Sequence, residues 1–130
     1  MAKHGSWTVI FEDKLVIKKN GEYGIEDGCG HQINDDAFWS QSKFSNIWAI
    51  QHGTTPNTDE VEYRDDTPHS QYDEATLGSI QEFTNRWDAA HLARLQSDWD
   101  LDNYFDETGT QETADAKVAR IGARPTSYTS

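Results

Sequence analysis

The sequence predicts an α+β fold: a small mixed or antiparallel sheet of about four strands, one long helix packed on it, and an extended C-terminal arm. Three observations support this prediction. Apolar residues alternate with period two in the first half of the chain, a later stretch carries them at helical spacing, and residues 103–130 show no period. The predicted boundaries are residues 1–102 for the α+β domain and 103–130 for the arm.

Residues 7–19 predict a β-hairpin with a short polar turn. Trp7, Val9 and Phe11 recur with period two and therefore share one face of a strand. A second strand follows the turn and ends at Asn20-Gly21. Residues 20–32 hold four of the nine glycines, a composition typical of turns, so this stretch is predicted to be a loop.

Residues 44–51 and 61–64 predict a second hairpin, whose strands are joined by a long polar loop. The first of these strands is the most apolar one and is expected at the centre of the core. The expected faces are Trp48 with Ile50, Ile47 with Ala49 on the opposite side, and Val61 with Tyr63 inward.

One long helix is predicted from Ser79 onward. Ser79 and Glu82 have the spacing of a capping box, in which each side chain binds the free backbone N–H of the other residue. An apolar stripe at helical spacing follows and is expected to pack across the sheet. Its members are Ile80, Phe83, Trp87, Ala90, Leu92, Leu95 and Trp99.

Composition excludes several classes of function. The formal net charge of −12 argues against direct binding to nucleic acid or to an anionic membrane, because both need clustered lysine and arginine. Cys29 is the only cysteine, so neither an intrachain disulfide nor a cysteine-based zinc site is expected. No stretch is apolar enough for a signal peptide or a membrane span, and synthesis in a cytoplasm is expected.

The motifs for chemistry are incomplete. Residues 98–102 place aspartates like the opening of an EF-hand, but Asn103 stands where glycine makes the turn, and Gly109 where a bidentate glutamate belongs. Cys29, His31 and Asp27 outline a thiol site that lacks a base of defined geometry. The glycines do not have the spacing of a phosphate-binding loop. The sequence therefore predicts no enzyme, no cofactor and no metal.

Seven acids lie in residues 59–74 against the single base Arg64. A row of carboxylates can imitate DNA phosphates, and it can also be an ordinary solvated surface. Both interpretations stay open at this point.

Two segments, taken together, resemble a family of phage proteins. They are FSNIWAIQHGTT followed by DEVEYRDDTPH, and the helix IQEFTNRWDAAHLARLQSDWD. Their order is similar to that of small proteins encoded among the tail and structural genes of tailed bacteriophages, notably marine cyanophages. Residues 92–99 also resemble the R-x-x-L-L-x-x-[ST]-D-W signature of phage tail assembly chaperones, although residues 100–102 depart from the proline-containing turn of that family. The resemblance covers roughly residues 44–99.

This resemblance implies a non-enzymatic structural protein, made in the host cytoplasm and located in the virion. The expected role is a minor tail or fibre component that docks on a larger oligomeric assembly, with other virion proteins or copies of itself as partners. The alternatives are a tail assembly chaperone and an acidic DNA mimic that inhibits a host DNA-binding protein.

The arm is the predicted docking element, mobile when alone and ordered on a partner. Lys117 and two arginines oppose the charge of residues 1–102, which carry 19 acids and eight bases, and so favour an acidic neighbouring copy. The candidate partner-binding residues are Tyr104, Phe105, Val118, Arg120, Ile121, Arg124 and Tyr128.

Overall fold

The computed structural model describes residues 6–19, 29–53 and 59–129. Contacts divide the chain into two compact units, a first that ends at Trp87 and a second of Asp88–Thr129. This boundary falls within the long helix, whereas the sequence predicted one after residue 102. Each unit is described by itself.

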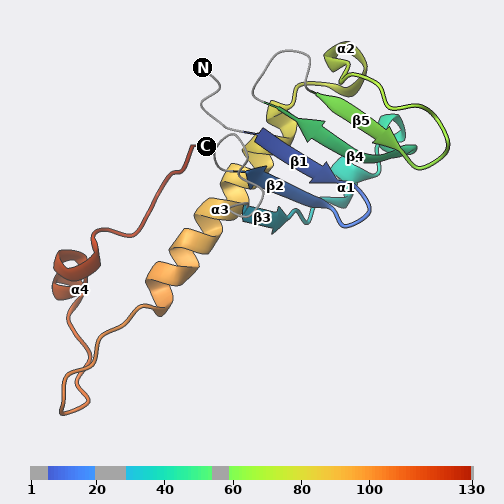
Figure 1. The fold of residues 1–130 in the computed structure, drawn as a ribbon. Coiled ribbons are helices and arrows are strands. Elements are labelled where there is room, and N and C mark those ends of the chain that lie inside the picture. The colour runs from blue at the N-terminus through green and yellow to red at the C-terminus, as the bar shows by residue number, and fades with distance from the viewer. Residues whose placement is uncertain (1–5, 20–28, 54–58, 130) are drawn as a thin grey trace. The chain divides into compact units, whose positions relative to one another are not determined.

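The first unit contains a five-stranded antiparallel sheet with the strand order β3-β2-β1-β4-β5 (Figure 1). The predicted α+β class is confirmed, with one strand more than expected. The strands are β1 (Ser6–Ile10), β2 (Leu15–Lys19), β3 (Cys29–Gln32), β4 (Ile47–His52) and β5 (Glu60–Tyr63).

The additional strand, β3, lies within residues 20–32, which the glycine content predicts to be a loop. It pairs with β2, and Gly30 stands opposite Ile17. A Cβ at Gly30 would lie 3.2 Å from Cγ1 of Ile17, so glycine here makes room for a side chain of the neighbouring strand. Residues 20–28 of the predicted loop lie outside the described residues.

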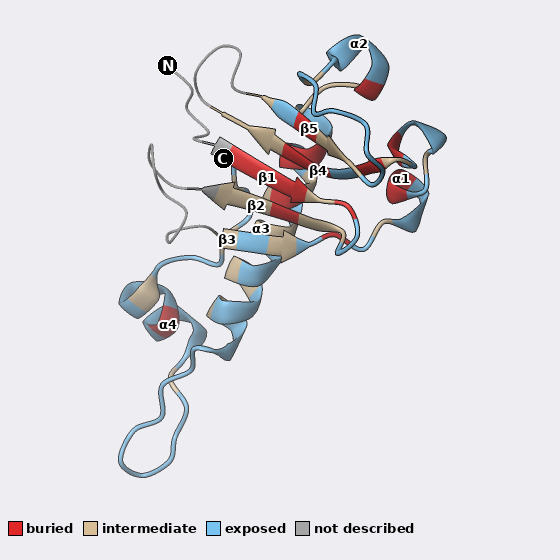
Figure 2. Cartoon of the chain, turned by 45° about the vertical axis from the view of Figure 1, so that its right-hand side comes forward, coloured by how far each residue is buried: buried red, intermediate tan, exposed pale blue. Residues whose placement is uncertain are grey.

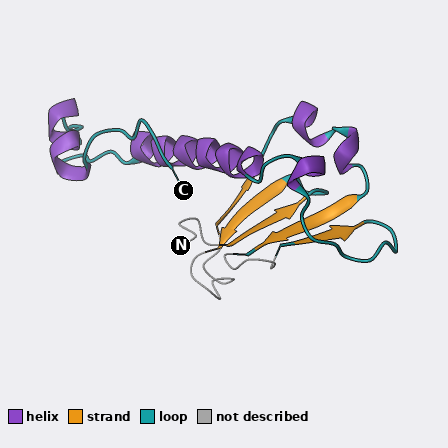
Figure 3. Cartoon of the chain, turned by 90° about the horizontal axis from the view of Figure 1, so that it is seen from above, coloured by secondary structure: helices purple, strands orange, loops and turns teal. Residues whose placement is uncertain are grey.

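Helices cover one side of this sheet (Figure 3). In the first unit these are α1 (Asp36–Trp39), the short η1 (Ser42–Phe44), α2 (Glu74–Leu77) and the first turns of α3 (Gln81–Leu101). Figure 2 shows the buried residues concentrated in the sheet and in the elements that cover it. As predicted, Trp7, Val9 and Phe11 are buried together.

Aromatic residues make up nearly half of the buried apolar residues of this core. Phe11 lies 5.0 Å from Phe44, 5.3 Å from Trp39 and 5.8 Å from Phe83, measured between ring centroids. Nearer the start of β1, the rings of Trp7 and Trp87 meet edge to face at 5.5 Å. Each large ring removes much apolar area from water, so a few of them are enough for a chain of low overall hydrophobicity.

The predicted faces of β4 are wrong at Ile47, which lies on the face of Ile50, and at Trp48. Ile50 is buried as expected, but Trp48 is 42% exposed, while Ile47 and Ala49 are both buried. A register shift between Ile47 and Ala49 explains the difference. The shift places an extra residue in β4, which breaks the strict alternation of side chains.

The long helix α3 has 21 residues and begins at Gln81, two residues after the predicted start. At its N-terminus Oγ of Ser79 accepts a hydrogen bond from the backbone N–H of Gln81 at 3.1 Å and not from that of Glu82, so Ser79 caps the helix without the predicted capping box. The carboxylate of Glu82 binds Arg86 instead, at 3.0 Å. Phe83 and Trp87 are buried, as the apolar stripe predicted. Among the helices of the described residues, none has the length and apolar character of a membrane span.

Candidate partner-binding surface

The second unit carries most of the exposed large apolar side chains. Leu101 is 77% exposed, Tyr104 56%, Phe105 55% and Val118 45%. Among the described residues only one further large apolar side chain is as open, that of Trp48 in the first unit. Figure 2 shows the chain between α3 and α4 (Ala114–Ile121) almost entirely in the colour of exposed residues. Because four exposed large apolar side chains fall within residues 101–118, this segment is the candidate interaction surface.

Residues 104–112, here called the aromatic loop, turn back on themselves between α3 and α4 (Figure 1). Phe105 forms an antiparallel bridge with Gln111. On either side of the bridge, the N–H of Asp106 donates to the carbonyl of Thr110 at 3.0 Å, and that of Glu112 donates to the carbonyl of Tyr104 at 3.0 Å. The loop is therefore a short hairpin that holds two exposed aromatic residues.

Asp106 fixes the tip of the aromatic loop. Its Oδ1 accepts hydrogen bonds from the N–H of Thr108 at 2.9 Å, the hydroxyl of Thr108 at 2.6 Å and the N–H of Thr110 at 2.9 Å. These bonds hold the pKa of the Asp106 carboxyl below its ordinary value. Gly109 completes the turn at φ 83°, a conformation that favours glycine.

Arg120 and Glu112 fix the base of the same loop. Arg120 donates to Oε1 of Glu112 at 2.9 Å and to Oε2 at 2.5 Å, and its Nη1 donates to Oδ1 of Asp102 at 3.0 Å. Oε2 of Glu112 also accepts the N–H of Tyr104 at 2.9 Å. The hydrogen bonds from Arg120, ahead of the other causes, lower the pKa of Glu112 to about 2. These contacts of Arg120, Glu112 and Asp102, here called the clamp, hold α4, the loop and the end of α3 together.

The other basic residues of the predicted arm are also engaged within the second unit. Arg124 binds both carboxylate oxygens of Asp100, at 2.9 and 3.0 Å. The ammonium of Lys117 lies 3.8 Å from the centroid of the Trp99 ring. The sequence predicts that these cations contact a neighbouring copy. In the structure they instead hold α4 on the C-terminal part of α3.

Residues 103–129 therefore do not form the extended arm that the sequence predicted. The indole N–H of Trp99 donates to the carbonyl of Gly122 at 2.9 Å, and the rings of His91 and Tyr128 lie 4.5 Å apart. Tyr128 and Ile121, two predicted partner-binding residues, are consequently half-buried.

The sequence did contain the signals of α4. Oγ1 of Thr113 accepts the N–H of Ala116 at 3.1 Å, and Gly122 ends the helix at φ 84°. A threonine cap and a glycine stop around an eight-residue stretch are a standard helix signature. From the sequence, only one helical turn at residues 116–121 could be suggested, because the segment is short and has few apolar residues.

The aspartates that resemble an EF-hand lie largely on a helix. Asp98 and Asp100 belong to α3, so they cannot take the looped backbone of that motif. Asp100 and Asp102 are bound by the guanidinium groups described above. Their function here is to hold α4 in place.

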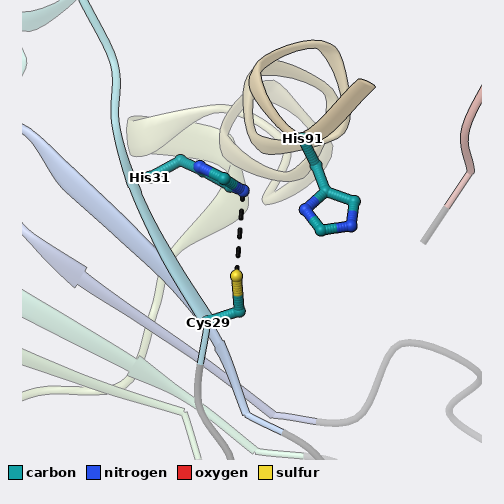
Figure 4. Close-up of side chains that lie close together, drawn as sticks. All are labelled: Cys29, His31 and His91. Carbon is teal, nitrogen blue, oxygen red and sulfur yellow. Dashed lines mark hydrogen bonds between the residues drawn. The ribbon is translucent and has the colours of Figure 1, made fainter. Parts of the chain in front are cut away.

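Cys29, the only cysteine of the sequence, lies beside a histidine. Sγ of Cys29 lies 3.8 Å from Nε2 of His31, both on β3 (Figure 4). Asp27, the third member of the hypothetical thiol site, lies outside the described residues. His91, drawn in the same view, belongs to the second unit and contacts Tyr128 there. Cys29 and His31 alone are two ligands, and a structural zinc site needs four.

Two open hollows occur in the described part of the first unit. One, of about 380 Å³, is lined by residues that include Lys43, Tyr63 and Leu77. The other, of about 410 Å³, lies beside Phe11 and the Lys14–Asp36 ion pair. The second unit leaves more large apolar side chains exposed than the rest of the described chain, so its surface is the stronger candidate for function.

No protein-family model matches this chain, and neither does any curated protein or solved structure.

The clamp makes the aromatic loop sensitive to acid. The pKa of Glu112 falls from 4.5 to about 2, so its contribution to the stability of the second unit is complete above about pH 4.5 and is lost as the pH falls toward 2. We expect the amide NMR signal of Tyr104 to shift between these values. Glu112→Gln is expected to perturb the signal already at pH 7, whereas Glu107→Gln, outside the clamp, leaves it in place. A Tyr104 signal that is insensitive to Glu112→Gln would contradict the clamp.

Proposed function

We propose that this chain is a non-enzymatic docking protein of a tailed-phage virion, a minor tail or fibre component that attaches to a larger assembly through its second unit. One observation supports docking above all: Tyr104 and Phe105 are exposed on a loop that is already fixed by the bonds of Asp106 and Glu112. Aromatic side chains dominate the binding energy of many interfaces.

The rigidity of the aromatic loop distinguishes a docking element from an ordinary exposed turn. A segment that orders on binding loses conformational entropy at that step, and a preorganised one does not. The hydrogen bonds at the tip and the base of the loop order it when the chain folds, so this conformational entropy is lost before binding. The aromatic side chains are then presented at little further cost.

The assignment to a phage virion is supported by the resemblance of residues 44–99 to tail and structural proteins of tailed phages. The same resemblance favours the second candidate, a tail assembly chaperone, through residues 92–99. The DNA-mimic alternative receives less support from the geometry. Several acids of residues 59–74 have local partners, as Glu60 has in His69 and Asp65 in the N–H of Thr67, and so do not form an open row.

Mass spectrometry of virions purified through a density gradient tests this proposal. We expect the chain to co-purify with intact particles at fewer copies than the main tail protein. A chain that is present in the infected-cell lysate but absent from the particles would contradict the proposal and favour the chaperone. The same fractions, disrupted into tails and capsids, locate the assembly on which the chain docks.

A further inference from the structure

The aromatic loop lies in the most acidic stretch of the second unit. Residues 95–116 contain seven acids and neither lysine nor arginine. Four of these acids have arginine partners within the second unit, since Arg120 binds two of them and Arg94 and Arg124 bind one each. The other three acids of residues 95–116, Asp106, Glu107 and Asp115, form no ion pair with a described residue.

Two of these acids directly follow the exposed aromatic pair in the chain. Asp106 uses Oδ1 for the turn and keeps its charge, because its pKa is lowered. Glu107 is exposed at the tip. The loop therefore presents Tyr104 and Phe105 beside two carboxylates whose charge no cation of the described residues balances.

The negative charge of the aromatic loop indicates which kind of partner can bind it. The first unit, residues 1–87, has 15 acids and seven bases, and the second, residues 88–129, has eight acids and four bases. A second copy would thus bring net negative charge against negative charge, and a nucleic acid would do the same. A basic protein surface is the complementary partner.

We infer that the aromatic loop docks into an apolar pocket whose rim carries lysine or arginine, on another protein of the assembly. This inference rests on the proposed function and names the chemistry of the partner. Phe105 fills the pocket, Tyr104 packs at its edge, and Asp106 and Glu107 meet its rim. Charges at a rim act mainly on the association rate and its salt dependence, so the inference is tested by kinetics.

The probe is a preparation of virions from a phage that lacks this gene, immobilised and exposed to the purified chain. We expect Glu107→Lys to slow association about fivefold in 50 mM NaCl, to change dissociation less than about twofold, and to lose its effect in 500 mM NaCl. Asp66→Lys is the matched control. Asp66 is exposed in the first unit, and its replacement changes the net charge equally, so association at the wild-type rate is expected.

The other outcomes would contradict either the inference alone or the inference together with the proposed function. If the wild type binds and Glu107→Lys does not slow its association, the inference is wrong and the proposed function is unaffected. The same holds if Asp66→Lys slows association as much, because net charge alone then explains the effect. If the chain self-associates and Phe105→Ser abolishes this self-association, the loop binds a second copy, and the inference is wrong. Absence of wild-type binding contradicts the proposed function and the inference together.

Discussion

Replacing Trp87 by alanine is expected to lower the free energy of unfolding of the first unit by about 3–5 kcal/mol, the range for buried large-to-small changes. Trp87 is 1% exposed, and its ring meets that of Trp7 at 5.5 Å. Its indole N–H also donates to the carbonyl of Cys29 at 3.0 Å, which ties α3 to the edge strand β3. Alanine leaves a cavity at this point and removes the hydrogen bond to the carbonyl of Cys29.

A denaturant melt followed by circular dichroism measures this change. Trp87→Phe keeps an aromatic ring but loses the hydrogen bond, so it is expected to cost less than Trp87→Ala. Trp48→Ala, at the exposed position of β4, serves as the control and should change the free energy of unfolding by less than about 1 kcal/mol. An equally small effect of Trp87→Ala would mean that the start of α3 does not close the core.

The double variant Tyr104→Ser with Phe105→Ser is expected to lower affinity for virions that lack the chain by about 100-fold or more, since central aromatic contacts carry most of the energy of an interface. Both side chains are more than half exposed in the isolated chain. The bonds that shape the loop come from its backbone, from Asp106 and from Glu112. The melting temperature should therefore stay nearly unchanged.

The matched control for this variant is Trp48→Ser, which removes an exposed aromatic ring from the first unit. It should bind the particles as the wild type does. Binding that survives the loss of both loop aromatics would exclude the aromatic loop as the docking element. A variant with a clearly lower melting temperature would show that these rings support the fold instead.

The sequence was sufficient for the elements whose apolar period is long. Trp7, Val9 and Phe11 form a period-two face, and Phe83 and Trp87 recur at helical spacing, so their burial follows from local pattern. The strand β3 was not predictable in this way. Its glycines are typical of turns, and only the pairing with β2, a long-range contact, makes Gly30 suitable in a strand. The shift at Trp48 likewise depends on the neighbouring strand β5.

The candidate surface was predictable in part. Tyr104 and Phe105 were expected to bind a partner because no apolar period continued through them, and the structure places both in the open. Arg120 and Arg124 were expected to contact an acidic neighbouring copy because they oppose the charge of residues 1–102. Their acidic neighbours within the chain are distant in sequence, so local pattern does not indicate them. Arg120 meets Asp102, and Arg124 meets Asp100, only because α4 folds back on α3. Ion pairs of this kind follow from the tertiary fold and not from local charge.

Photocross-linking tests the central claim, docking through the aromatic loop, most directly. The substitution Phe105→p-benzoylphenylalanine places a reactive group on the loop, and the same replacement at Trp48 is the control. After assembly into virions and illumination, we predict that the chain labelled at position 105 forms one discrete covalent product with another virion protein, and that the chain labelled at position 48 does not. Cross-links from position 48 alone, or from neither position in particles that contain the chain, would contradict docking through residues 104–112.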